Sequence, residues 1–98
     1  MGLRDDADLL ILTSLAGGAR HGYAMIEDIA SITGIRLGPG TLYGAIGRLE
    51  AEGMIEALEI DDRRRPYQIT PQGRRRLETE IGGMKGLIAA GLRRLKRA

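Results

Sequence analysis

The stretch YAMIEDIASITGIRLGPGTLYGAIGRLEAEG, residues 23–53, decides the fold because it holds two helical patterns on either side of a turn. Apolar side chains recur at spacings of three and four in its first part, which predicts a helix with a buried face of Tyr23, Ile26, Ile29, Ala30 and, at its edge, Ile32. Glycine and proline between residues 33 and 40 predict a turn. Pro39 suits the start of the next helix, since its missing N–H would have no partner there. We expect that helix to end at Gly53, with a buried stripe of Leu42, Ile46 and Leu49.

A short helix is predicted before this stretch. Asp5, Asp6 and Asp8 suit a helix N-terminus, and a run follows until a pair of glycines stops it. The apolar residues of this run are Leu9, Leu10, Ile11, Leu12 and Leu15. Because this segment is apolar on more than one side, we expect it to lie at the centre of the fold or to be shared with a partner.

Two short runs with Ile, Leu and Tyr follow the stretch, residues 54–60 and 66–70, and predict a two-stranded β-hairpin with a charged tip. Thr70 and Pro71 then suit the N-cap and first position of a long last helix, which we expect to run to about Arg97. An apolar stripe that long at the end of a chain requires a partner. The stripe consists of Leu77, Ile81, Met84, Ile88, Leu92 and Leu95.

This order of elements predicts a mostly α fold with a small two-stranded β-wing, that is, a winged helix-turn-helix followed by a long C-terminal helix. The chain of 98 residues has the size of one compact domain, with the DNA-binding region at 1–70 and the dimerisation helix at 71–98. The helix-turn-helix arrangement places one helix in the DNA major groove. Of 15 Lys and Arg residues all but two are Arg, and they cluster. From charge alone, contact with nucleic-acid phosphates and solvated faces explain these clusters equally well.

Five short motifs carry a resemblance to a known family. They are residues 21–23 (HGY), 39–43 (PGTLY), 48–50 (RLE), 52–56 (EGMIE) and 67–74 (YQITPQGR). Their order and spacing resemble those of the PadR-like transcriptional regulators, in the short class with a single C-terminal helix. The resemblance implies a homodimer, in which the first and last helices pack together, bound to a pseudo-palindromic operator in double-stranded DNA. It also implies repression and, in some relatives, release by a small-molecule effector.

The same resemblance implies the DNA contacts. Thr41 and Tyr43 would hydrogen-bond phosphates at the start of the recognition helix, and Arg48 would reach a phosphate or a base edge from the same face. The wing arginines would enter or straddle the minor groove. The expected DNA-binding set is Gly40, Thr41, Tyr43, Gly44, Gly47, Arg48, Arg63, Arg64 and Arg65. The expected dimer set is Leu9, Leu12, Leu77, Ile81, Met84, Ile88, Leu92 and Leu95.

Each of these assignments has a plainer alternative. Thr41 can help to cap the helix, Tyr43 can cover the edge of the core, and the wing can be a solvated loop balanced by its own aspartates. Glycine at positions 38 and 47, where the family usually carries polar or basic side chains, favours recognition of DNA shape over base readout. The glycines of the last helix can allow close helix approach, leave an effector cavity or weaken the helix.

The sequence offers little for catalysis. It has no Cys, and His21, which we expect to start a helix, is its only His, so no enzyme activity, cofactor or metal site is expected. No apolar run approaches the roughly 18 residues of a membrane span, and we expect a cytoplasmic protein. The main alternative to a DNA-binding regulator is a protein-interaction module that uses the winged fold with little or no specific DNA binding.

Overall fold

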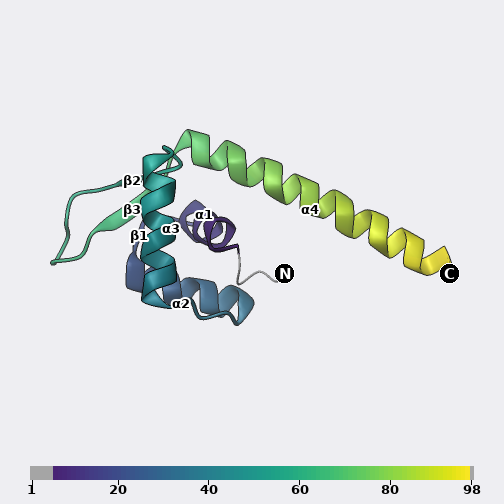
Figure 1. The fold of residues 1–98 in the computed structure, drawn as a ribbon, viewed down its shortest axis with the longest axis horizontal. Coiled ribbons are helices and arrows are strands. Elements are labelled where there is room, and N and C mark those ends of the chain that lie inside the picture. The colour runs from purple at the N-terminus through teal and green to yellow at the C-terminus, as the bar shows by residue number, and fades with distance from the viewer. Residues whose placement is uncertain (1–5, 98) are drawn as a thin grey trace.

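The computed structural model describes residues 6–97, so Asp5 of the expected acidic group lies outside them. Its elements are α1 (Ala7–Ala16), β1 (Arg20–His21), α2 (Gly22–Thr33), α3 (Pro39–Ala51), β2 (Ile55–Ala57), β3 (Pro66–Ile69) and α4 (Pro71–Arg97). The first three helices and the sheet form a body, and α4 extends away from it (Figure 1). The molecule is therefore elongated, with extents of 56 × 26 × 20 Å. The mostly α fold with a β-wing and a long last helix is as predicted.

Helix α1 lies at the centre of the body, where it contacts all three other helices and β3. Ile11, Leu12 and Leu15 have almost no exposed surface, which explains why this segment is apolar on most of its sides. The helix begins with a cap, because the Asp6 carboxylate accepts a hydrogen bond from the backbone N–H of Leu9. Its buried Ser14 hydroxyl donates to Asp28 Oδ2 at 2.7 Å, so this polar group is satisfied inside the core.

The buried face of α2 differs from the predicted one. Gly22, Met25, Ile26 and Ile29 are buried, whereas Tyr23 is 60% exposed and Ile32 is 58% exposed. The face is rotated because Gly22 rather than Tyr23 turns toward α3, where the Tyr43 side chain lies against it. Ile32 lies in the last turn of the helix, which ends at Gly34 with a left-handed φ of 76°.

The sheet has three strands where the sequence predicted two. Strand β3 lies between β1 and β2 and pairs antiparallel with both, with Arg20 opposite Tyr67 and Ile55 opposite Ile69. Strand β1 was missed because two residues are too few to show an alternating pattern. The wing strands are also shorter than predicted, since the chain beyond β2 leaves the ladder before it reaches the tip.

A tight junction connects the wing to α4. Thr70 caps the helix as predicted: its hydroxyl accepts from the N–H of Gly73 at 3.1 Å and donates to the carbonyl of Gly53 at 2.6 Å. Gly73 has no room for a side chain, because a Cβ would collide with the carbonyl oxygen of Met54. These contacts fix the direction in which α4 leaves the body.

Candidate nucleic-acid interface

A strip of glycines along the exposed face of α3 is bare of side chains, and Tyr43, Arg48 and Glu50 are exposed on either side of it. Its core side carries Leu42, Ala45, Ile46 and Leu49, all buried. The opposite side presents Gly40, Gly44 and Gly47, and a Cβ placed at Gly40 or Gly47 would meet only open space. No side chain caps the N-terminus of this helix at Gly38, so the N–H groups of its first turn point outward without a side-chain acceptor. Another molecule can therefore approach the helix backbone closely.

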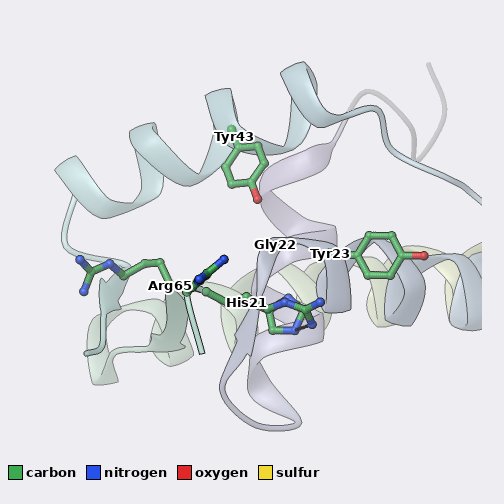
Figure 2. A pocket seen from close by; sticks show the side chains of 7 residues that line it. His21, Gly22, Tyr23, Tyr43 and Arg65 are labelled. Carbon is green, nitrogen blue, oxygen red and sulfur yellow. Dashed lines mark hydrogen bonds between the residues drawn. The ribbon is translucent and has the colours of Figure 1, made fainter. Parts of the chain in front are cut away.

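A cleft of about 420 Å³ lies beside this face, between α3, the start of α2 and the wing. It is lined by His21, Gly22, Tyr23, Tyr43, Arg63, Arg64 and Arg65. Figure 2 shows the Tyr43 hydroxyl directed from α3 toward Gly22, whereas the Tyr23 hydroxyl points away from the cleft. A Cβ at Gly22 would collide with the Tyr43 hydroxyl, so this glycine allows the close contact. Tyr43 is 54% exposed and leans over the cleft rather than covering the core.

His21 connects the start of α2 to the wing. Its Nδ1 accepts from the backbone N–H of Ala24 at 3.3 Å, which caps α2 as the sequence indicated, and its Nε2 lies 3.1 Å from Nη1 of Arg64. A neutral imidazole has one acceptor nitrogen and one donor N–H, so it cannot accept from both groups at once. Which of the two groups the ring accepts from depends on its tautomer, and in either case the Arg64 guanidinium lies in the cleft beside His21.

The wing tip is a tight two-residue turn. The N–H and C=O groups of Asp61 and Arg64 bond to each other at 2.8 and 3.0 Å, and the central Asp62 and Arg63 have φ values of 50° and 66°. Two positive φ values match the type I′ turn that joins twisted antiparallel strands. The side chain of Arg65 turns back to donate to the carbonyl of Leu58 and that of Arg64 turns to His21, whereas Arg63 is exposed at the tip.

On the other flank of α3, Arg48 is exposed but paired. Its Nη2 donates to Oδ1 of Asp8 on α1 at 3.0 Å, and Oδ2 of the same carboxylate lies 3.6 Å from Arg76 on α4. Arg76 also lies 3.6 Å from Glu52 and 3.1 Å from Glu80. The sequence did not indicate this network, because Asp8 and Arg48 are separated by 40 positions.

Two ionisable groups near this surface have shifted pKa values. Burial disfavours the charge of Arg76, but the hydrogen bond and charge of Glu80, with the charges of Asp8 and Glu52, raise the pKa of Arg76 above its ordinary value. Burial raises the pKa of the Tyr67 hydroxyl, and the charge of Glu50 adds to this shift. Arg76 therefore stays cationic and Tyr67 neutral near pH 7.

The predicted dimer residues fall into two groups. Leu9, Leu12 and Leu77 are buried in the core of their own chain, so they offer no surface to a second copy. The remaining residues of the stripe are exposed along the projecting part of α4: Ile81, Met84, Ile88, Leu92 and Leu95. Leu87, outside the predicted stripe, is 74% exposed beside them.

The described residues present neither of two other kinds of site. Within residues 6–97, no group of three His, Asp or Glu side chains is placed to hold a metal ion. None of the helices in the same range has both the length and the apolar character needed to cross a bilayer.

Comparison with known proteins decides the family. The profile described as "Transcriptional regulator PadR-like family" matches residues 11–79, which run from α1 into α4. The chain belongs to the PadR-like family. It is a family of transcriptional regulators and not of enzymes, and the membership confirms the resemblance carried by the five sequence motifs.

Three relatives illustrate this membership. The PadR-like chain is 42% identical to "Transcriptional regulator Rv3488" of Mycobacterium tuberculosis over 82 residues, 81% of this chain and 76% of that protein. It is 48% identical over 83 residues to an uncharacterised 37.1 kDa protein of a Streptomyces fradiae transposon, covering 85% of this chain but only 24% of that protein. A transcriptional regulator from Clostridium thermocellum has a similar structure, with a TM-score of 0.78, 28% identity and coverage of 90% and 88% of the two chains.

Proposed function

We propose that this PadR-like protein binds a pseudo-palindromic operator in double-stranded DNA as a homodimer and represses transcription in the cytoplasm. The observation that carries the proposal is the bare face of α3 beside a cleft into which His21, Tyr43 and the wing arginines converge. A major groove admits an α-helix, and phosphates border it on both sides. A smooth helix with hydrogen-bond donors and cations along its flanks matches that shape.

Each flank of α3 has an assigned partner in this proposal. Tyr43 and the first-turn N–H groups hydrogen-bond phosphates, and Thr41, exposed in the same turn, adds a hydroxyl. Arg63 and Arg64 reach the neighbouring minor groove from the wing tip, where a narrow groove attracts arginine. Because the centre of α3 is glycine, base-edge contacts are few and operator choice rests mainly on DNA shape and deformability.

A second copy of the chain covers the exposed apolar side chains of α4. Five of them lie within one arc of the helix, and burying an exposed Leu or Ile contributes roughly 1.5–3 kcal/mol. Two such helices packed together would hold two winged units at a fixed spacing, as a palindromic operator requires. The glycines of α4 would leave room between the helices for a small-molecule effector that releases the DNA.

The test is binding to a duplex that carries the promoter region upstream of the protein's own gene, against a scrambled duplex, across a salt series. We expect selective binding that weakens by orders of magnitude between about 50 and 200 mM salt, as about six to ten phosphate contacts require. Arg64→Ala should weaken binding. It should also reduce the slope of the logarithm of the binding constant against the logarithm of the salt concentration, by about one for each phosphate that the variant no longer neutralises.

Arg93→Ala is the matched control, because it removes the same charge at the far end of α4, away from the wing (Figure 1). Equal weakening by Arg64→Ala and Arg93→Ala would show that only overall charge matters. Weak, salt-insensitive and unselective binding by the wild-type protein would instead support the protein-interaction module.

A further inference from the structure

The ion pair between Arg48 and Asp8 lies at the edge of the bare face of α3. Arg48 is 61% exposed, but its guanidinium is not free, because Nη2 donates to Oδ1 of Asp8 at 3.0 Å. The other terminal nitrogen, Nη1, lies 3.9 Å from where a Cβ of Gly44 would stand. The guanidinium therefore lies along the helix one turn before its own Cα, with one edge held and another edge open to solvent.

Asp8 is held in turn from a third helix. Its Oδ2 is 3.6 Å from Arg76 of α4, and its side chain is only 20% exposed. Arg76 is shared with Glu52 and Glu80, so it holds Asp8 in place as one member of a network of three carboxylates. One carboxylate thus connects the body helix α1 to the recognition helix α3 and to the projecting helix α4.

The sequence left open whether Arg48 contacts a phosphate or a base edge, and this geometry favours the phosphate. Base edges face the centre of a recognition helix, which is here the glycine surface, whereas the flanks of the helix face the phosphates. Arg48 lies on a flank, and its position is fixed by Asp8. A guanidinium offers five N–H donors, so an Arg that gives one edge to a carboxylate keeps others for a phosphate.

We propose that Asp8 is a positioning residue that fixes Arg48 as a clamp for a DNA backbone phosphate, and that Arg76 in turn holds Asp8 in place. The proposal rests on the DNA-binding function proposed above and specifies one contact of that interface. Fixing the side chain before DNA arrives removes part of the conformational entropy cost of ordering a long side chain on binding.

The test compares Asp8→Asn, Arg48→Ala and the double variant on operator and scrambled duplexes across a salt series, with thermal melting of each protein. Exposed ion pairs couple by about 0.2–1 kcal/mol, so Asp8→Asn should weaken binding by a factor of about 1.4 to 5 per subunit on both duplexes. The direction is diagnostic, because removing an acidic charge would by itself tighten binding to DNA. In the Arg48→Ala background, Asp8→Asn should cause no further weakening.

Glu27→Gln is the matched control. It removes the same charge and breaks another exposed arginine pair, in which Arg36 donates to Glu27 at 2.6 Å, but it does not touch Arg48. We expect this variant to bind DNA at least as tightly as the wild type.

Two results would overturn the positioning role. Tighter binding by Asp8→Asn would mean that the carboxylate competes with DNA for Arg48. Weakening that persists in the Arg48→Ala background, with a matching fall in melting temperature, would mean that Asp8 acts only through stability. Either result would leave the proposed DNA-binding function intact. If the wild-type protein showed no salt-dependent binding to DNA, both the DNA-binding function and the positioning role of Asp8 would be contradicted.

Discussion

At the scale of single residues, a side chain added at Gly22 or at Gly73 would collide with a neighbour, but the two collisions have different consequences. A Cβ at Gly22 would meet the hydroxyl end of Tyr43, an exposed side chain that can move. A Cβ at Gly73 would meet the carbonyl oxygen of Met54, which belongs to the backbone that joins α3 to the wing. The first collision changes the surface, and the second strains the fold.

We therefore expect Gly22→Ala to fold normally but to bind DNA more weakly. Tyr43 is 54% exposed and can move toward solvent without disturbing the core, so the melting temperature should stay close to that of the wild type. The displaced hydroxyl leaves the cleft, and affinity should fall by about as much as in Tyr43→Phe. Affinity measurements on both variants check this, and wild-type affinity in Gly22→Ala would contradict the assignment of Tyr43.

Gly73→Ala is the control for that prediction. The backbone cannot yield without moving α4, so overpacking should cost about 1–3 kcal/mol of the free energy of unfolding. DNA affinity of the folded fraction should change little, since Gly73 lies at the start of α4 and outside the cleft.

At the scale of elements, the sequence predicted the helices well and the surface less well. Capping residues are local signals, so His21 and Thr70 mark helix starts that the structure confirms. Strand β1 and the rotated face of α2 depend on contacts with β3 and Tyr43, which no local pattern reports. The ion pair of Asp8 and Arg48 was not predicted for the same reason. The DNA-binding set itself stays a prediction.

The wing tip permits a test that separates backbone shape from charge. Arg63 has φ of 66°, a conformation that costs a non-glycine residue roughly 1 kcal/mol or more. We expect Arg63→Gly to raise the free energy of unfolding by about 1 kcal/mol, measured by denaturant titration, and yet to weaken DNA binding because the cation is absent. Arg63→Ala should weaken binding equally without the rise in stability. Unchanged affinity in both variants would remove Arg63 from the interface.

At the scale of the whole molecule, the projecting part of α4 is hard to explain for an isolated chain. From Ile81 onward almost every side chain is exposed, and these include six large apolar ones. A helix with this much exposed apolar surface is stabilised chiefly by packing against another element. Within residues 6–97 no other element contacts its far end, so a second copy is the partner that the proposed function supplies (Figure 1).

Leu92→Asp tests the dimer and its link to DNA binding together. Leu92 is 58% exposed within the apolar arc, and a carboxylate there would have to lose its water inside an apolar interface, so we expect sedimentation to show monomers. Arg93→Asp is the matched control, because one further residue turns the side chain by about 100° out of that arc, and this variant should remain a dimer. When one winged unit of a dimer is bound, the other is held at a high effective concentration beside the adjacent half-site. The Leu92→Asp monomer should therefore lose much of its operator affinity. Its winged unit should still unfold cooperatively on heating. A dimer that persists in Leu92→Asp would remove α4 from the interface, and operator binding would then have to be explained from a single winged unit.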